Sequence, residues 1–273
     1  MPGTTRGRQL GGRRFAHQPA DKHIHDTEGA TMSTAENPYA SFGMMAADAS
    51  ADVRAGFIRK TYTHLVAAVL AFAGIEALIL TLTPEAKLAA ITQTMFSGYN
   101  WLIVLGSFMF VSWIANRWAS SATSLATQYV GLGVYVVAEA IIFLPLLYVA
   151  SVFGGADIIP SAAVITLIVF VGLTVIVFTT RADLSGIGPY LGIAGLFALG
   201  LIACSILFGF QLGVFFTCVM IAFAAGYILY STSNVLHHYR TDQHVAAALA
   251  LFASVALLFW YILQLLMTLS GRD

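Results

Sequence analysis

Seven apolar segments separated by short polar breaks constrain this chain more than any other feature of its sequence. They fall at about residues 61–82, 99–118, 125–150, 160–180, 188–209, 212–236 and 245–269. Each is close to the roughly 20 residues that an α-helix needs to cross a bilayer. Only 10% of the 273 residues are charged, against about 25% in an ordinary soluble domain. The sequence therefore predicts an all-α integral membrane protein with seven transmembrane helices in contact with the lipid bilayer.

The positively charged residues indicate how these helices are oriented. Eight of the 13 lysines and arginines precede residue 61, and Arg117, Arg181 and Arg240 fall in loops on the same predicted side. Only Lys87 and Arg272 fall on the opposite side. Because Lys and Arg concentrate in cytosolic loops, this distribution predicts a cytosolic N-terminus and a C-terminus across the membrane. Basic residues before a first membrane helix indicate orientation, so no nucleic-acid partner is expected.

The N-terminal region differs in composition from the rest of the chain. Residues 1–56 are polar and lack sustained periodicity, so we expect a mostly disordered cytosolic tail before a membrane domain over residues 57–273. The stretch "MSTAENPYA", which begins at Met32, has the character of a translation start. Residues 1–31 are therefore expected to be an upstream extension. The segment from Val53 to Tyr62 is expected to form a short amphipathic lead-in on the membrane surface.

Two formal charges fall well inside the predicted spans, Glu76 in the first and Glu139 in the third. A carboxylate at mid-membrane costs about 2.5–3.5 kcal/mol on insertion scales, so such a group faces protein, a watery cavity or a partner. Glu139 lies near the middle of its segment, and two interpretations stay open. It is either a proton- or cation-responsive group or a carboxyl group that only hydrogen-bonds a neighbouring helix. Glu76 lies toward the outer end, within reach of the membrane interface; the same two interpretations stay open for it, and the structural one is favoured.

No pattern in the sequence predicts catalysis, so the chain is not expected to be an enzyme. It contains neither HExxH nor GxxxxGK[ST], the signatures of a zinc protease and a nucleotide-binding loop. The serine of "DLSG", residues 183–186, has no nearby histidine to act as its base. His237, His238 and His244 lack the thiolates or paired carboxylates that would complete a metal site. We therefore expect solvated histidines that respond to pH near neutrality, with no metal and no cofactor.

Several short motifs occur together in a recognisable order. They are "FIRKTYTHL" before the first span, "FLPLLYVAS" in the third, "TTRADLSGIGPYL" between the fourth and fifth, and "YILYSTSNVLHHY" in the sixth. Over about residues 57–269 the chain resembles the Bax inhibitor family, in a form typical of bacteria. The resemblance implies a bacterial inner-membrane protein whose last helix is surrounded by the other six. It also implies either a pH-sensitive calcium leak or a role in stress survival and membrane-protein quality control.

The resemblance also implies a gate made by two aspartates, one on each of the last two helices. Here Ser231 and Ser254 occupy those positions. Serine hydroxyl groups do not titrate near neutral pH, and they give calcium no charged ligand. Serines in place of the two aspartates therefore argue against an aspartate-gated leak. Arg117 resembles the family's basic end of the second helix and loses its expected carboxylate partner at position 231. Arg181 and Asp183 belong to the basic-x-Asp turn, while His237, His238 and Arg240 belong to the loop after the sixth helix.

Two functions therefore stay open from the sequence. In the first, the chain provides a path for cations, either calcium or protons, or for a small solute, and Glu139 supplies the remaining charge. In the second, it is a non-transporting regulator or scaffold that acts on another membrane protein, such as a quality-control protease.

Overall fold

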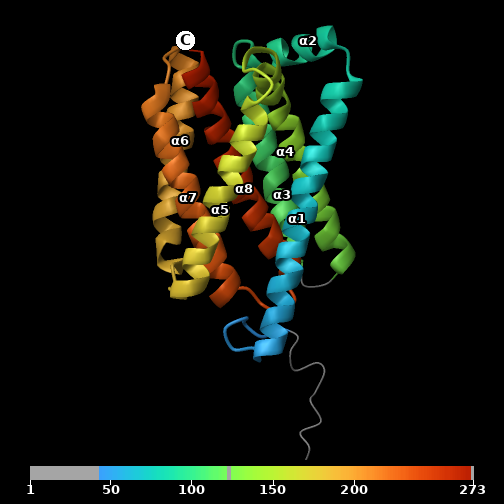
Figure 1. Ribbon diagram of the computed structural model, residues 1–273, viewed down its shortest axis with the longest axis vertical. Coiled ribbons are helices and arrows are strands. Elements are labelled where there is room, and N and C mark those ends of the chain that lie inside the picture. Colours follow the sequence, from blue (N-terminus) through green and yellow to red (C-terminus); the bar gives the residue numbers. More distant parts are fainter. Residues whose placement is uncertain (1–42, 122–123, 272–273) are drawn as a thin grey trace, which may run out of the picture. The chain divides into compact units, whose positions relative to one another are not determined.

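The structure, a computed structural model, describes residues 43–121 and 124–271. Within them, seven helices are long and apolar enough to cross a membrane, which confirms the predicted all-α membrane fold (Figure 1). These helices are α1 (Ala51–Leu82), α3 (Asn100–Ala119), α4 (Leu125–Phe153), α5 (Ile158–Thr180), α6 (Gly188–Phe208), α7 (Gly213–His237) and α8 (His244–Ser270). Two shorter elements complete the described part, the helix α2 (Glu85–Phe96) and the 3-10 helix η1 (Ser185–Ile187).

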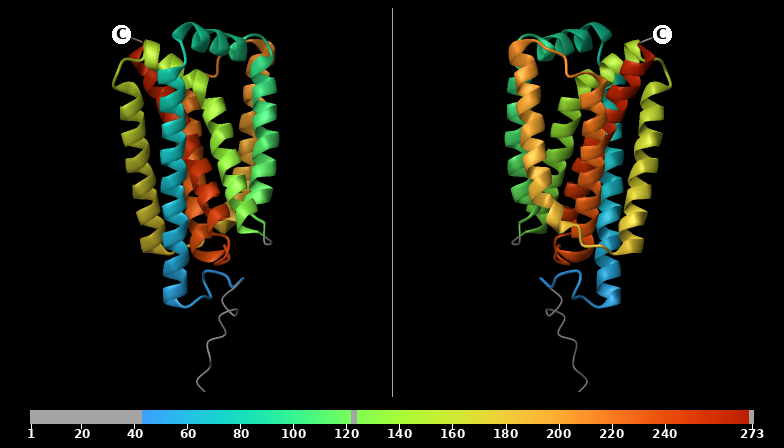
Figure 2. Two further views of the ribbon diagram at one scale, coloured as in Figure 1. Left: turned by 90° about the vertical axis from the view of Figure 1, so that its right-hand side faces the viewer. Right: turned by 90° about the vertical axis from the view of Figure 1, so that its left-hand side faces the viewer.

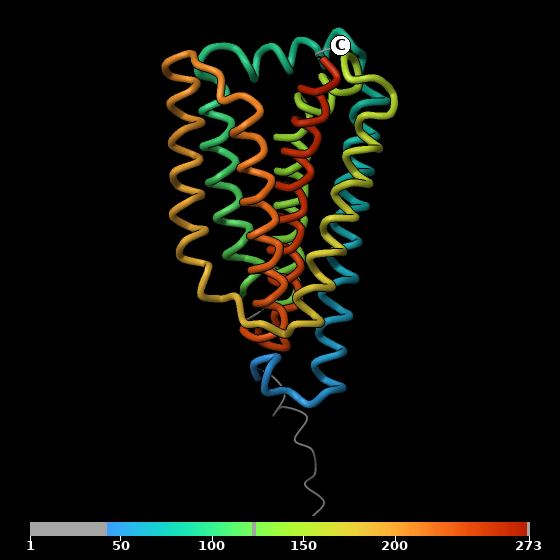
Figure 3. Tube along the Cα trace, turned by 60° about the vertical axis from the view of Figure 1, so that its left-hand side comes forward, coloured from blue at the N-terminus to red at the C-terminus, as the bar shows by residue number. Residues whose placement is uncertain are grey.

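Helix α8 lies in the middle of the bundle, as expected for the last helix. It packs against α7, α1, α5, α4 and α3, and Leu249, Leu251, Leu258 and Leu263 are fully buried. Helix α6 departs from this arrangement because it packs mainly against α7 and η1. Ala198 is its one buried residue. Figure 3 shows α6 at the outer side of the bundle, next to α7.

Helix α1 is longer than predicted. It begins at Ala51 and has 32 residues, which corresponds to about 48 Å at 1.5 Å per residue. Its buried residues Phe57, Thr61 and Leu65 recur every four positions, so one face continues into the membrane-spanning part without a break. The prediction of a separate surface helix from Val53 to Tyr62 is therefore wrong.

The residues just before α1 turn back beneath the loop between α7 and α8 (Figure 2). The backbone N–H of Ala46 donates to the carbonyl of Tyr239 at 2.9 Å, and the N–H of Thr241 donates to the carbonyl of Met44 at 3.0 Å. Ala46 is fully buried by this contact. The predicted disordered tail is therefore wrong for residues 43–56, because backbone pairing orders the segment before α1. Residues 1–42, including the expected extension over residues 1–31, lie outside the described residues.

Helix α2 lies between the first two predicted spans and was not predicted from the sequence. Its twelve residues are too few to span a bilayer. Pro84 occupies its N-cap position, and Leu88 and Thr92 are its buried residues. It packs against α4 and α3 and crosses the end of the bundle where the described chain ends, opposite the α7–α8 loop (Figure 2).

Candidate functional site

A cavity of about 990 Å³ lies between α3, α4, α6, α7 and α8. On α8 its lining residues extend from Leu249 to Thr268, a distance of about 28 Å at 1.5 Å per residue. The hydrocarbon core of a bilayer is about 30 Å thick. The cavity therefore follows α8 over a length comparable to the apolar part of the membrane.

The walls that α6 and α8 contribute to the cavity contain several small residues. Gly195 and Ala198 face it from α6, and Ala250 and Ala253 face it from α8. Small residues at a helix interface normally allow close approach, but α6 packs mainly against α7 and η1 rather than α8. The short side chains of Ala198, Ala250 and Ala253 therefore leave room beside α8, while the space next to Gly195 is taken up by the ring of Phe223.

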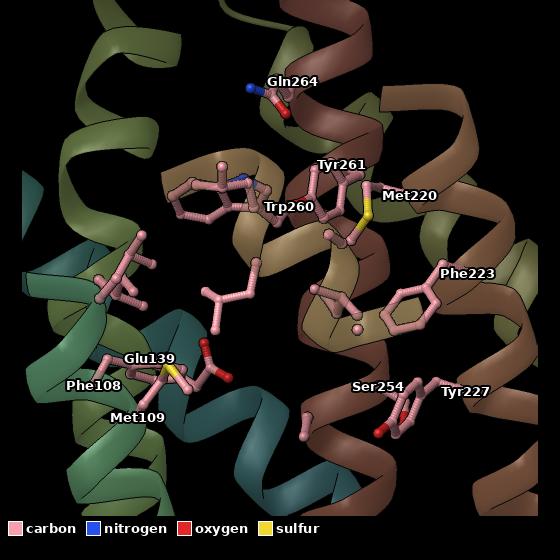
Figure 4. A pocket seen from close by; sticks show the side chains of 18 of the residues that line it. Phe108, Met109, Glu139, Met220, Phe223, Tyr227, Ser254, Trp260, Tyr261 and Gln264 are labelled. Carbon is pink, nitrogen blue, oxygen red and sulfur yellow. The ribbon is translucent and has the colours of Figure 1, made fainter. Parts of the chain in front are cut away.

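Glu139 is the one formally charged residue among the described residues that line this cavity. It lies midway along α4 and is only 5% exposed. The Tyr135 hydroxyl, one helical turn before it, lies close enough to interact with the carboxyl group. In Figure 4 the Glu139 carboxyl group points into the cavity, between Phe108 of α3 and Trp260 of α8. The structure thus places a carboxyl group at the wall of the cavity.

Glu76, the other predicted intramembrane carboxylate, lies elsewhere. It is only 4% exposed, and neither carboxylate oxygen has a hydrogen-bond partner among the described residues. It follows Phe72 by one turn on the same face of α1, and the Phe72 ring packs against Phe143 of α4 and Phe252 of α8. Glu76 therefore does not reach the membrane interface, because this face of α1 is turned toward α4 and α8. It does not line the cavity with Glu139.

Ser231 of α7 and Ser254 of α8 lie next to one another in the wall of the cavity. Their hydroxyl oxygens lie 3.1 Å apart, and both residues are buried. The Ser254 hydroxyl also donates to the carbonyl of Ala250 at 2.8 Å. Since a serine hydroxyl has one proton to donate, the Ser231 hydroxyl must be the donor in the contact between the two serines. The pair is therefore a satisfied hydrogen bond between neutral groups.

The turn before η1 is joined to the end of α7 by polar contacts. Asp183 accepts a hydrogen bond from the N–H of Ser185 at 2.9 Å, and both its carboxylate oxygens lie 3.0 Å from Nε2 of His238. The bond from Ser185 and the contact with His238 lower the pKa of Asp183 to about 2. Ser233 of α7 accepts from the N–H of Leu184 at 2.8 Å. These contacts fix the turn that connects α5 to α6.

The remaining predicted residues are dispersed around this end of the bundle. Arg117 is exposed near the end of α3, and Arg181 has a left-handed backbone at φ 51°. The Arg240 guanidinium pairs with Asp242 at 2.6 Å, and this carboxylate raises the pKa of Arg240. The three histidines expected to be solvated have separate contacts, and His244 is buried. His237 contacts the Ser233 carbonyl, His238 contacts Asp183, and the His244 ring lies 5.0 Å from the ring of His64 on α1.

The aromatic lining of the cavity is not predicted by the sequence, in which only the charged groups inside the apolar segments stand out. The set comprises Trp101, Phe108, Tyr135, Phe143, Phe210, Phe216, Phe223, Tyr227, Tyr230, Tyr239, Trp260 and Tyr261. One signal was present on α7, where Tyr227, Ser231 and Asn234 follow one another at helical spacing and share one face. Aromatic residues are common in membrane helices, so this spacing alone does not show that they face a cavity.

The amino-acid sequence is similar to those of several known proteins. A family profile described as "Inhibitor of apoptosis-promoting Bax1" matches residues 54–271. The chain is 28% identical over 237 residues to Bax inhibitor 1 of Schizosaccharomyces pombe, covering 83% of this chain and 82% of the relative. It is 24% identical over 223 residues to Protein LIFEGUARD 3 of Arabidopsis thaliana, covering 80% and 86%. An uncharacterized protein of Pseudomonas aeruginosa is 28% identical over 227 residues, covering 80% and 91%.

Proposed function

The chain belongs to the Bax inhibitor family, and we propose that it lets cations cross a bacterial inner membrane along the cavity, with Glu139 as the charged group on the path. The observation that carries the proposal is the cavity itself. It follows α8 from Leu249 to Thr268, and the described residues lining it include a single carboxylate. A path of this length along a central helix is what passage through a bilayer requires.

The electrostatics of the cavity favour a cation over an anion. Moving an ion from water into a cavity with apolar walls costs free energy. One carboxylate lowers this free energy for a cation and raises it for an anion. Neutral polar groups lie toward both ends. Asn116 and Asn234 line the cavity near the α7–α8 loop, while Gln264 and Thr268 line it near the opposite end. An entering ion would therefore exchange water for amide and hydroxyl groups before it reaches Glu139.

The same groups are poorly suited to calcium. Ca²⁺ takes six to eight oxygen ligands and is bound in proteins largely by carboxylates and carbonyls. Ser231 and Ser254 contribute hydroxyl groups that already bond to each other at 3.1 Å. One carboxylate and a neutral serine pair match a single positive charge better than a double one. We therefore expect protons or potassium ions to pass more readily than calcium ions.

The proposal predicts that purified protein in liposomes carries potassium or proton flux above that of empty liposomes between pH 5 and 8. Glu139→Gln should reduce this flux about fivefold or more, because an attraction of only about 1 kcal/mol changes cation occupancy roughly fivefold. Flux is measured with a potassium- or pH-sensitive dye inside the vesicles, and calcium flux is measured in parallel.

Glu76→Gln is the matched control. It makes the same chemical change in another buried carboxyl group that does not line the cavity, so flux should stay close to that of the unaltered chain. Flux equal to that of empty liposomes throughout the pH range, or equal loss in both variants, would refute the proposed path.

A further inference from the structure

The cavity is much larger than a simple ion needs. Its volume of about 990 Å³ is at the upper end of the range of roughly 300–1,000 Å³ that is usual for sites of drug-sized ligands. Most of its walls are apolar or aromatic, with a few polar groups, which is also typical of such sites. The flexible side chains of Met109 and Met220 line it from α3 and α7, and methionine adapts readily to irregular ligands.

The charge of the cavity restricts which ligand fits. Glu139 is 5% exposed and is the single formal charge among the described lining residues. The Tyr135 hydroxyl gives this carboxyl group a hydrogen-bonding neighbour but no opposite charge. Burial of a carboxylate without an opposite charge is costly, so a ligand with one positive charge would compensate it. An anionic ligand would add repulsion, and a doubly charged cation would keep one charge without a partner.

Aromatic rings lie on both sides of Glu139. Tyr135, one turn before it, packs against Phe108 with ring centroids 6.0 Å apart. Phe143, one turn after it, packs edge-on against Trp260 with ring centroids 5.0 Å apart and an interplanar angle of 88°. Faces of aromatic rings attract organic ammonium groups, and such cages bind quaternary ammonium ligands elsewhere. Tyr135 and Phe143 are buried, whereas Phe108 and Trp260 are only part-buried. A cationic group beside the Glu139 carboxylate could therefore also contact the rings of Phe108 and Trp260.

We propose that this cavity binds a hydrophobic organic cation with a single charge, held by Glu139 and the rings of Phe108 and Trp260, with Tyr135 and Phe143 packed behind them. The apolar part of the ligand would occupy the space between α6, α7 and α8. This inference rests on the proposed function in placing a cation beside Glu139, and it adds the chemical class of a ligand large enough to fill the cavity.

Equilibrium binding of tetraphenylphosphonium to the full chain in lipid nanodiscs at pH 8 tests the assignment, with binding to empty nanodiscs subtracted. We expect saturable binding of about one cation per chain. Glu139→Gln should weaken it at least tenfold, because removing one partner of a buried charge pair is costly. Glu76→Gln should leave it within about twofold. Trp260→Leu keeps the carboxylate and removes one ring, and it should weaken binding roughly three- to thirtyfold.

Tetraphenylborate separates charge from shape, since it has nearly the same size and the opposite charge. It should show no saturable binding. Equal saturable binding of both ions, no saturable binding of the phosphonium, or equal affinity in the Glu139→Gln and unaltered chains would each overturn the assignment. Phosphonium binding without ion flux would support this inference and refute the proposed path. Ion flux without phosphonium binding would support the path and refute this inference.

Discussion

At the scale of single residues, Asp183 shows how one exposed carboxylate fixes a turn between two membrane helices. It accepts a hydrogen bond from the N–H of Ser185 and lies 3.0 Å from Nε2 of His238 at the end of α7. These contacts favour the ionised form and lower the pKa from its ordinary 3.8 to about 2. A carboxyl group with a depressed pKa stabilises the fold above its unfolded-state pKa and loses that effect as the pH falls toward the folded-state pKa.

We therefore expect Asp183→Asn to lower the melting temperature of the detergent-solubilised protein slightly at pH 7. The difference from the unaltered chain should shrink as the pH falls from about 4 to about 2, because the native carboxylate is protonated in that range. The effect should also weaken in high salt, since the pair is exposed. Melting is followed by intrinsic fluorescence.

Asp157→Asn is the control for this change. Asp157 is also exposed and lies at the N-cap of α5, where its side chain makes no capping hydrogen bond. A difference at pH 7 that persists unchanged at pH 2, or an equal effect of Asp157→Asn, would contradict the assigned role of Asp183.

At the scale of elements, the packing of α3 against α4 depends on one glycine. A Cβ atom at Gly131 would lie 2.6 Å from both the carbonyl oxygen of Ala115 and the backbone nitrogen of Ala119 on α3. Backbone atoms cannot move aside as a flexible side chain can. Small residues allow such close approach between membrane helices, where packing rather than a hydrophobic driving force holds the helices together.

Gly131→Ala is expected to destabilise the protein by about 1–3 kcal/mol, because it forces α3 and α4 apart. Gly133→Ala, two residues along the same helix, meets nothing within 4 Å. It should be neutral or stabilise the helix by up to about 1 kcal/mol through alanine's higher helix propensity. Unfolding in a mixed-detergent titration measures both changes, and equal destabilisation by the two variants would show that close approach at Gly131 is not the cause.

At the scale of the whole molecule, the ends of the bundle differ in charge. Arg117, Arg181 and Arg240 belong to the end that carries the α7–α8 loop, whereas Lys87 lies on α2 at the opposite end. The bias of Lys and Arg toward cytosolic loops therefore gives an orientation that can be measured.

We expect a cysteine introduced as Lys87→Cys to react with a membrane-impermeant maleimide in intact bacterial cells, and one introduced as Ser120→Cys to react only after permeabilisation. Both positions are exposed at opposite ends of the bundle. The native Cys204 and Cys218 are replaced by serine in both variants. The reverse labelling pattern would show that the helices cross the membrane in the opposite sense.

Part of the candidate site was accessible from the sequence. A charge inside an apolar segment is conspicuous, so the sequence predicts Glu139 as a site residue. The register of the last two helices against the resembled family predicts Ser231 and Ser254. The aromatic residues around Glu139 were not identified. In a membrane helix the lipid-facing and protein-facing sides are both apolar, so no contrast in hydrophobicity distinguishes Trp260, which lines the cavity, from Trp113, which is exposed.

The sequence by itself determined the number and approximate positions of the membrane-spanning helices. Segment length and hydrophobicity are local properties, and they decide whether a helix can cross a bilayer. Only the tertiary structure decided what Glu76 and Glu139 face. Both are carboxyl groups in apolar segments, yet Glu139 lines a cavity while Glu76 lies on the face of α1 that packs against α4 and α8. That difference depends on contacts between helices far apart in the chain, which no local pattern of residues records.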